Sequence, residues 1–458
     1  MTPARPDPAH PSEPPKPSES PHPSVRPTPY VPPHPPGPPD LRITAVTVTP
    51  VAFREPPLLN AVGVHEPYAL RAVVEVATDQ GLTGLGETTA DEGHLERLRT
   101  AAAAVTGLPV HALGRIRARV AAVLGGRTGS DRHGLTGPIT AASTVDRVFS
   151  PLEVACLDVQ GRAAGRPVSD LLGGRVRDAV PYSAYLFHKW AGHPGGPPDG
   201  WGEAVDTAGV LAQARRLVDA YGFTALKLKG GVRPPREEVE TVLALHEAFP
   251  GLPLRLDPNA AWTVGTALDT AGRLEGVLEY LEDPTPGLDG MARVAEGTAI
   301  PLATNMCVTA FEHVPPAVAR RSVRIVLADH HYWGGLHRSR LLAGICDTFG
   351  LGLSMHSNAH LGISLAAMTH LAAASPELTH ACDTHWPWRT EDVIEPGVLT
   401  LADGAVRVPT GPGLGVELDR DALARLHGQY LACGLRTRDD TGYLRRIDPS
   451  YRRRIPRW

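Results

Sequence analysis

The sequence predicts an α/β protein, in which a barrel of parallel strands follows a smaller α+β unit. The main observation is a series of six short apolar runs, each of which ends in a charged or polar residue, and the end residues follow one another at intervals of 23 to 28 positions. That interval fits one strand, one helix and two loops, and such alternation implies parallel strands joined by right-handed crossovers. The runs occupy residues 225–229, 254–257, 278–282, 301–305, 323–329 and 351–356.

Bulk composition narrows the class of protein. The chain has 458 residues, a net charge of −4 and a pI near 6.6, which gives no reason to expect a nucleic acid or a membrane surface as partner. Its five cysteines include no CxxC pair, as is typical of reduced thiols in a cytoplasmic protein. No stretch approaches the roughly 20 apolar residues of a membrane helix. We therefore expect a cytoplasmic protein that binds a small molecule.

The first forty residues have a different composition. Residues 1–40 are dominated by Pro, with Ser and His between, and cannot bury enough apolar surface to offset their ordering entropy. We predict a disordered tail with polyproline II character. The stretch lacks the apolar centre of a signal peptide. A PxxP ligand role is the alternative, and a passive tail is the better interpretation.

Residues 41–178 are predicted to form the α+β capping domain. Residues 43–53 alternate like a strand, and two further alternating runs flank Asp79-Gln80-Gly81 as in a hairpin. Helical patterns and one Gly- and Thr-rich loop follow. The predicted elements are the hairpin strands 69–78 and 82–87, the helices 93–106, 113–124 and 152–164, and the loop 125–143.

From residue 179 the pattern changes to alternating strands and helices, and we assign residues 179–404 to the barrel. Residues 182–187 are the predicted first strand and 379–383 the last. Residues 405–458, with a helix at 420–433, are predicted to leave the barrel and return to the capping domain. The predicted barrel helices are 210–221, 236–249, 266–276, 290–297, 312–320, 335–349 and 359–374.

Two lysines end the first of the six runs. Lys227 and Lys229 are two apart on a strand, so both side chains face the same way. Two ammonium groups on one inner face would lower each other's pKa, and a lysine with a lowered pKa can act as a general base. The alternative is a solvated pair at a frayed strand end.

Three oxygen donors end the next three runs. Asp257, Glu282 and Asn305 would meet at the mouth of a barrel, because the C-terminal ends of its strands share one face. Hard oxygen ligands without a thiolate suit Mg²⁺. The alternative is that each acid caps the helix that follows it.

An Asp and a His end the last two runs. A carboxylate such as Asp329 beside an imidazole such as His356 fixes the tautomer and raises the basicity of the ring. His356 and His360 also have the i, i+4 spacing of a zinc pair. We discount zinc, and with it a zinc hydrolase, because a strand-to-loop transition separates the two and no HxH motif opens the barrel.

These groups together indicate a reaction class. A base removes a proton beside a carboxylate, a divalent ion stabilises the resulting enediolate, and a second acid/base group either reprotonates the carbon or helps a hydroxide to leave.

At this point the chain resembles the enolase superfamily, and within it the glucarate dehydratase family. The resemblance covers residues 42–440 and implies a modified (β/α)7β TIM-like barrel with an α+β capping domain. It rests on several motifs together: Asn60-Ala-Val-Gly-Val-His-Glu-Pro67, Tyr185-Leu-Phe187, Lys227-Leu-Lys229, Asp257-Pro-Asn-Ala-Ala-Trp262, Glu282-Asp-Pro284, Ala303-Thr-Asn-Met306, His356-Ser-Asn358, Asp383-Thr-His-Trp386 and Arg438-Asp-Asp440.

The resemblance implies a role for each matching residue. Lys229 would be the base on one face of the substrate, with Lys227 as its neighbour and a contact of a substrate carboxylate. His356, paired with Asp329, would be the base on the other face and the acid that expels the β-hydroxyl. The implied Mg²⁺ ligands are Asp257, Glu282 and Asn305, and the implied substrate-binding set adds Asn60, His65, Tyr185, Asn259, Ser357, Asn358, His385 and Arg438.

The implied reaction is dehydration of a dicarboxylate sugar. D-glucarate or its epimer L-idarate would give 5-dehydro-4-deoxy-D-glucarate and water. His65 would lie on a lid loop from the capping domain, and we expect a homo-oligomer. Another acid-sugar dehydratase, an epimerase, or a weakly active relative that only binds are the alternatives.

The chain departs from the family pattern in three places. Ala260 replaces a Gly, the Asp-Pro-His of the dyad strand reads Asp329-His330-His331, and the segment between Glu282 and Asn305 is shorter. Because of that shorter segment, Asp289 is the alternative to Glu282 as metal ligand. A substrate Thr from the capping domain is also implied, and Thr140 and Thr144 are both candidates.

Overall fold

The computed structural model describes residues 41–130, 134, 135 and 137–458. The predicted Pro-rich tail, residues 1–40, lies outside the described residues. Residues 41–458 form one compact unit.

A three-stranded antiparallel sheet opens the described chain. Its order is β1-β4-β5, and the predicted strand and hairpin are confirmed. A short hairpin, β2 with β3, precedes β4 and carries Asn60. The bounds are β1 (Ile43–Arg54), β2 (Leu59–Asn60), β3 (Gly63–Val64), β4 (Tyr68–Thr78) and β5 (Thr83–Thr89).

Four helices follow the sheet, and one of them begins earlier than predicted. Helix α3 starts at residue 141 and not at 152, because Thr140 and Ser143 form a capping box ahead of it. Pro151 lies inside the helix, one position before the predicted start. The helices are α1 (Glu92–Val105), α2 (Leu113–Leu124), α3 (Ala141–Ala164) and α4 (Val168–Leu171).

Helix α3 packs closely on strand β5. A Cβ added to Gly86 would lie 2.1 Å from the carbonyl oxygen of Pro151, so only glycine permits this approach. A proline lacks the N–H that would satisfy the carbonyl one turn earlier in the helix.

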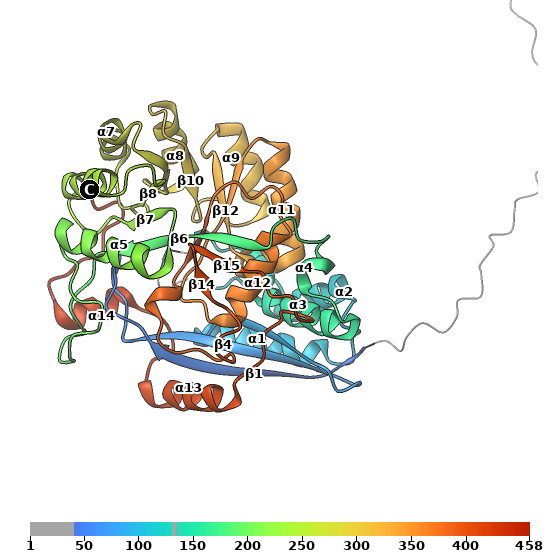
Figure 1. The fold of residues 1–458 in the computed structure, drawn as a ribbon. Helices are drawn as coiled ribbons and strands as arrows, with labels where there is room; N and C mark the ends of the chain where they lie inside the picture. Colours follow the sequence, from blue (N-terminus) through green and yellow to red (C-terminus); the bar gives the residue numbers. More distant parts are fainter. Residues whose placement is uncertain (1–40, 131–133, 136) are drawn as a thin grey trace, which may run out of the picture. The chain divides into compact units, whose positions relative to one another are not determined.

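Eight parallel strands form the barrel, and helices surround it in Figure 1. Each strand from β6 to β11 pairs with the next one along the chain, and β13 pairs with β6. Strand β13 also contacts β12, which completes the ring. At the site end of the barrel, Lys229 lies beside Asp257 in the register of β7 with β8. The strands are β6 (Ala179–Phe187), β7 (Leu226–Lys229), β8 (Leu254–Asp257), β9 (Leu278–Glu282), β10 (Leu302–Thr304), β11 (Ile325–Ala328), β12 (Gly352–Met355) and β13 (Cys382–Thr384).

One helix follows each of the first seven barrel strands, which confirms the predicted (β/α)7β architecture. A short helix, α10 (His330–Trp333), intervenes directly after β11, and η1 (Phe311–His313) precedes α9. The seven helices are α5 (Thr207–Tyr221), α6 (Pro235–Ala248), α7 (Val264–Leu274), α8 (Gly287–Glu296), α9 (Val314–Arg320), α11 (Leu336–Thr348) and α12 (Gly362–Ala373).

After the barrel the chain meets the first sheet again. Helix α13 (Arg420–Cys433) packs on β1, and Figure 1 shows it beneath that strand. Gln429 donates a hydrogen bond of 2.9 Å to the carbonyl of Ala52. The domain boundaries at residues 178 and 404 stay predictions. The remaining elements are η2 (Trp386–Trp388), β14 (Leu401–Ala402), β15 (Ala405–Arg407) and α14 (Asp440–Ile447).

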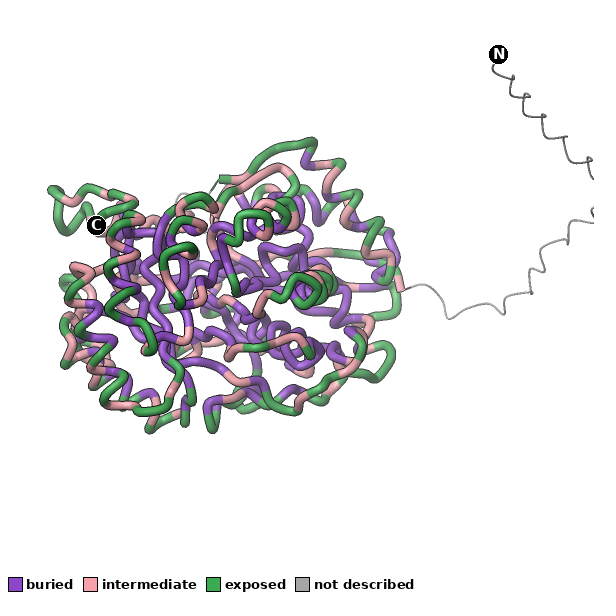
Figure 2. The backbone as a smooth tube through the Cα atoms, turned by 90° about the horizontal axis from the view of Figure 1, so that it is seen from above, coloured by how far each residue is buried: buried purple, intermediate pink, exposed green. Residues whose placement is uncertain are grey.

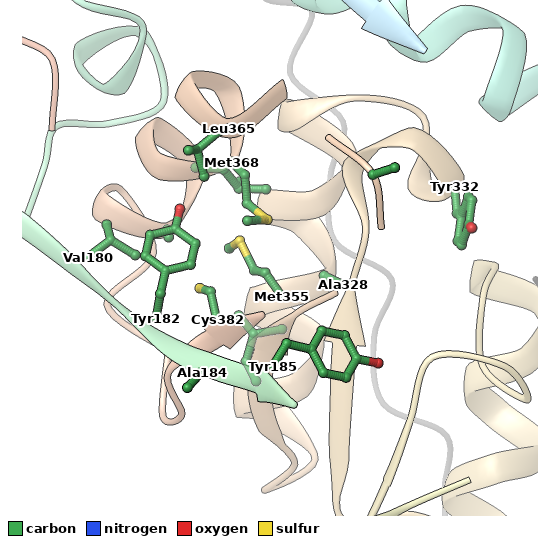
Figure 3. Close-up of a cluster of buried hydrophobic side chains, with 14 of the residues drawn as sticks. Val180, Tyr182, Ala184, Tyr185, Ala328, Tyr332, Met355, Leu365, Met368 and Cys382 are labelled. Atoms are coloured by element: carbon green, nitrogen blue, oxygen red, sulfur yellow. The ribbon is translucent and has the colours of Figure 1, made fainter. Parts of the chain in front are cut away.

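Buried segments run through the interior of this unit, and exposed ones lie on its outside (Figure 2). Every residue of α12 is buried, as is typical of an apolar helix enclosed on all sides. Tyr182 of β6 reaches toward it among Leu365 and Met368 (Figure 3), and its hydroxyl lies 2.8 Å from that of Thr369. This cluster packs α12 against β6, the strand that pairs with β13.

Two further features bear on the sequence expectations. All five cysteines are free, and four of them are buried. Within the described parts of the chain, no helix is both long enough and apolar enough to cross a membrane.

Candidate active site

A cavity lies where the barrel strands end, with segments of the capping domain and of the C-terminal segment on its other sides. Most of the predicted site residues line it together, while Lys227, Asp257, Glu282 and Asp329 lie buried beneath its surface. Leu135, Phe187 and Tyr332 complete the wall. The predicted residues in the lining are Asn60, His65, Tyr185, Lys229, Asn259, Asn305, His356, Ser357, Asn358, His385 and Arg438.

The two lysines of β7 have different surroundings. The ammonium group of Lys229 reaches the cavity and lies 2.6 Å from Oδ2 of Asp257. Lys227 is fully buried, 2.6 Å from Glu282 and 2.7 Å from Asp383, so its predicted contact with a substrate carboxylate is not what this arrangement presents.

The expectation that the lysine pair lowers the pKa of both members is wrong for Lys227. Burial alone would lower its pKa, but the carboxylates of Asp383 and Glu282 outweigh burial and raise the pKa well above its usual value. Lys227 is therefore a permanent cation that balances buried acids. Lys229 is the lysine in a position to exchange a proton with a bound molecule.

Asp383 and Tyr185 complete this layer of the barrel. Asp383 on β13 was part of a family motif in the sequence but had no assigned role; its place at a strand end was the available signal. The hydroxyl of Tyr185 donates to Asp257 at 3.1 Å, and the face of its ring lies 4.7 Å from the ammonium of Lys227, which adds a cation–π contact.

Three oxygen donors meet near these lysines, as predicted from the strand ends. Glu282 and Asp257 both lie within 4 Å of Lys227. Asn305 follows β10 and lines the cavity. The alternative ligand Asp289 is elsewhere: its side chain is 87% exposed and pairs with Arg320. Of the two candidates for the second metal ligand, only Glu282 lies near Asp257.

Asp283, which the sequence reasoning missed, shapes the loop that carries Asn305. Its carboxylate accepts hydrogen bonds from the hydroxyl of Thr304 and from the backbone N–H groups of Asn305 and Met306. Burial raises the pKa of Asp283 to about 7. Its own φ of 37° lies in the left-handed region, so this acid sits at a sharp turn directly after Glu282.

The donor set fits a divalent cation such as Mg²⁺. The side-chain oxygen of Asn305 and Oε1 of Glu282 are buried and accept no hydrogen bond from any described residue. Leaving such oxygens without a partner costs free energy, and a hard cation coordinated by oxygens would satisfy them. Asp257, Glu282 and Asn305 are thus the residues that could hold the ion.

The predicted pair of Asp329 and His356 is present, and His356 lines the same cavity as Lys229. Nδ1 of His356 lies 3.0 Å from Oδ2 of Asp329. Burial opposes ionisation of Asp329, but the neighbouring imidazoles, His331 foremost, bring its pKa well below the usual value. The carboxylate is therefore ionised, and it orients the ring of His356 with Nδ1–H as donor.

His331 is a further residue to which the sequence prediction assigned no role in the site. Its Nδ1 lies 2.7 Å from Oδ1 of Asp329. With His330 these groups form a cluster of possible metal ligands, yet Nε2 of His331 lies 3.0 Å from the guanidinium of Arg71, a position unfavourable for a cation. The ring of His360 packs on His331 at 4.8 Å, which gives the discounted zinc pair no support.

The capping domain and the chain after α13 supply the remaining wall. Arg438 donates two hydrogen bonds, of 2.9 and 2.8 Å, to Asp440, and Asn60 donates to the same carboxylate at 2.6 Å. His65 pairs with buried Glu55 at 3.0 Å. A Cβ at Gly63 would lie 2.3 Å from the carbonyl of Asp440, so the two segments press together. Arg438 is the permanent cation of this wall, and it also lines the cavity.

His385 provides an uncharged partner in the same wall. Burial, followed by the charges of nearby cationic groups, lowers its pKa well below the usual value. Its ring contacts Tyr185 edge-on at 5.0 Å. A neutral imidazole both donates and accepts, which suits a hydroxyl group.

Neither candidate threonine lines this cavity. The hydroxyl of Thr140 donates to Glu312 at 2.8 Å, and that of Thr144 donates to the carbonyl of Thr140 at 2.7 Å. Thr140 caps helix α3, and Thr144 lies in the first turn of that helix. Thr144 instead faces a neighbouring cavity, which Arg71 and Arg147 also line.

Comparison with known proteins agrees with this geometry. The profile of the family "Mandelate racemase / muconate lactonizing enzyme, N-terminal domain" matches residues 42–173, and that of "Enolase C-terminal domain-like" matches residues 209–422. A probable glucarate dehydratase of Streptomyces coelicolor is 54% identical, over 92% of this chain and 99% of its own.

Two solved structures are similar over nearly the same length. An enolase from Thermobispora bispora, in complex with magnesium and formate, is 65% identical with a TM-score of 0.90, covering 91% of this chain and all of its own. An enolase from Mycobacterium smegmatis, in complex with tartrate, is 68% identical with a TM-score of 0.89, covering 92% and 99%. The chain therefore belongs to the enolase superfamily and, within it, to the glucarate dehydratase family.

Proposed function

We propose that this enzyme is an acid-sugar dehydratase that depends on Mg²⁺ and acts on a hexarate. The proposed substrate is D-glucarate, its epimer L-idarate, or both. The proposed products are 5-dehydro-4-deoxy-D-glucarate and water, formed through an enediolate. The probable glucarate dehydratase from Streptomyces coelicolor supports this reaction type.

One observation carries the proposal: two proton-transfer groups reach the same cavity from non-adjacent strands. Lys229 comes from β7, and His356 follows β12. A carbon between them would present one face to an amine and the other to an imidazole. Abstraction of a proton beside a carboxylate needs a base, and departure of the neighbouring hydroxide needs a proton donor.

In the proposed reaction, Lys229 or His356 removes the proton, according to the configuration of that carbon. When His356 has taken the proton, it returns that proton from Nε2 to the leaving hydroxyl, so that water departs, and Asp329 stabilises the imidazolium between the two steps. When Lys229 takes the proton, His356 receives the substrate with Nε2 already protonated and donates that proton to the leaving hydroxyl. Bound Mg²⁺ would supply the positive charge that stabilises the enediolate oxygens, held by Asp257, Glu282 and Asn305.

The walls suit a diacid. Arg438 lines the cavity, and its guanidinium can bind a carboxylate by donating hydrogen bonds to it. Asn60, His65 and His385 offer donors for hydroxyl groups. Two relatives have been solved in complex with small carboxylates, one with formate and one with tartrate, which supports a carboxylate substrate.

The test is turnover of a panel of hexarates by the purified protein with Mg²⁺, with the keto product measured. We expect turnover of D-glucarate or L-idarate, and loss of turnover with EDTA. Replacement of Lys229 or His356 by Ala should lower the dehydration rate at least about a hundredfold with the fold intact. If no hexarate is dehydrated, the proposal is wrong.

The same two groups also permit epimerisation without loss of water, because a proton removed on one face can return on the other. Analysis of recovered substrate separates the two reactions. A product mixture that contains only the epimer would favour an epimerase.

We also propose a homo-oligomer that works in the cytoplasm. Light scattering of the purified protein measures the first, and cell fractionation the second.

A further inference from the structure

The carboxylate of Asp329 is shared between two imidazoles, and the proposed chemistry uses only one of them. His356 binds Oδ2 at 3.0 Å. His331 binds Oδ1 through its ring at 2.7 Å and through its backbone N–H at 3.0 Å. Asp329 and His331 are both buried, so these contacts have no competition from bulk water.

The second nitrogen of His331 identifies its tautomer. Nη2 of Arg71 lies 3.0 Å from Nε2 of His331. A guanidinium only donates hydrogen bonds, so Nε2 accepts, and the ring proton is on Nδ1 and points at Asp329. The hydroxyl of Ser364 is a further neighbour of Nε2, at 3.0 Å.

Arg71 belongs to the capping sheet and is itself held. Its Nε donates to Glu87 of β5 at 2.7 Å, and Glu87 also accepts from the backbone N–H groups of Leu361 and Ser364 at the start of α12. Both charged side chains are buried. A continuous chain of polar contacts thus runs from the capping sheet through His331 to Asp329.

Two further titratable rings pack on His331 and carry no charge near neutral pH. The rings of His330 and His360 lie 4.0 and 4.8 Å away, and burial lowers the pKa of both well below the usual value. The charges that face the ring are therefore those of Asp329 and Arg71, with Glu87 behind Arg71.

We propose that His331 is a positioning residue for the acid–base pair of Asp329 and His356. It occupies Oδ1, so that Oδ2 is the oxygen that orients His356 and Nε2 of His356 is the nitrogen that meets the substrate. Arg71 keeps the His331 ring in the tautomer that this requires. The inference rests on the proposed function and deepens it.

The first test separates the two faces of the site. His331→Phe removes the hydrogen bond to Asp329, whereas His331→Asn retains an N–H at the position of Nδ1 and loses the contact with Arg71. D-glucarate and L-idarate differ at one carbon, so one presents its proton to His356 and the other to Lys229. Exchange of that proton with solvent deuterium is measured for each.

For His331→Phe we expect exchange on the His356 face to fall about 10- to 100-fold, as for other residues that orient a functional side chain. Exchange on the Lys229 face should stay within about threefold, and KM should change little. His331→Asn should recover most of the loss. Equal slowing on both faces, or no slowing, would overturn the inference.

His330→Phe is the matched control. It replaces a buried histidine on the same short helix whose Nδ1 has no hydrogen bond to any described residue, and it should behave like the unchanged protein. If the protein without substitutions dehydrates no hexarate, that result contradicts the proposed function but not the inference about His331. The inference is then decided by ¹⁵N NMR of the histidine rings, where His331→Phe should convert His356 from one tautomer to a mixture. A single tautomer retained there overturns it.

Discussion

The backbone angle of one residue shows what a departure from the family pattern costs in conformational free energy. Ala260, which stands where the family has Gly, has a φ of 61°, and its neighbour Asn259 has a φ of 50°. An L-residue in the left-handed region costs roughly 1–2 kcal/mol, apart from Asn and Asp, which tolerate it better. This loop follows Asp257 directly, so it carries strain next to the proposed metal ligands.

Relief of that strain is the first prediction. Ala260→Gly should raise the free energy of unfolding by up to about 1 kcal/mol, less than the full strain because Gly also gains entropy in the unfolded chain. Urea denaturation measures it. Ala261→Gly, in the same loop without positive φ, should lower stability instead, and equal effects of both changes would contradict the explanation.

The second prediction concerns the buried charges around Lys227. Lys227→Met leaves Glu282 and Asp383 buried without their cation, and breaking a buried ion pair costs about 3–5 kcal/mol. Denaturation of the metal-free protein measures the loss. The double variant Lys227→Met with Asp383→Leu should lose less than the single variant. A single variant as stable as the unchanged protein would show that these charges are not paired in solution.

At the scale of elements, the contact of α3 with β5 depends on one missing side chain. Gly86→Ala would force the helix away from the sheet, because the new Cβ would lie 2.1 Å from the carbonyl of Pro151. We expect a loss of about 2 kcal/mol or more, as for overpacked interiors. Thermal unfolding measures it.

Gly114→Ala is the control for that change. Gly114 lies in the first turn of α2, and no atom lies within 4 Å of an added Cβ. Alanine favours helix, so this variant should be as stable as the unchanged protein or slightly more so. If Gly86→Ala is equally harmless, the close packing is not rigid.

Periodicity made most elements predictable, and long-range contacts set the limit. The strand-end residues Lys229, Asp257 and Asn305 repeat at the interval of a strand and a helix, so their meeting at one face followed from the sequence. The roles of Asp383 and His331 depend on contacts that periodicity does not predict. Asp383 contacts Lys227, far away in the sequence, and His331 turns back onto Asp329 around a tight turn. The predicted start of α3 was wrong because the capping box of Thr140 and Ser143 begins the helix earlier, at residue 141.

For the whole molecule, buried neutral histidines predict sensitivity to acid. Burial foremost lowers the pKa of His94 to about 3, and those of His188 and His370 to about 4. In the unfolded chain each would bind a proton near pH 6.5. Stability from these groups is therefore fully present above that pH and is lost as the pH falls toward about 4.

Each such group adds a slope of up to about 1.4 kcal/mol per pH unit across this range. We expect His188→Phe to lower the slope of unfolding free energy between pH 6 and pH 4.5 by about that amount. Chemical denaturation at several pH values measures it. His246→Asn, at an exposed position, should leave the slope unchanged, and a slope unaffected by His188→Phe would contradict the assignment.

The ion cluster at the base of the site also has a consequence for synthesis. Lys227 leaves the ribosome well before Asp383, which follows it by 156 residues. Until β13 is made, the ammonium of Lys227 lacks one of its two close carboxylates, and the ring of strands lacks the member that closes it. Domains that depend on such distant partners form late and expose unfinished surface meanwhile. A nascent chain stalled before β13 should therefore be held by chaperones and cut by proteases, whereas one released after β13 should not.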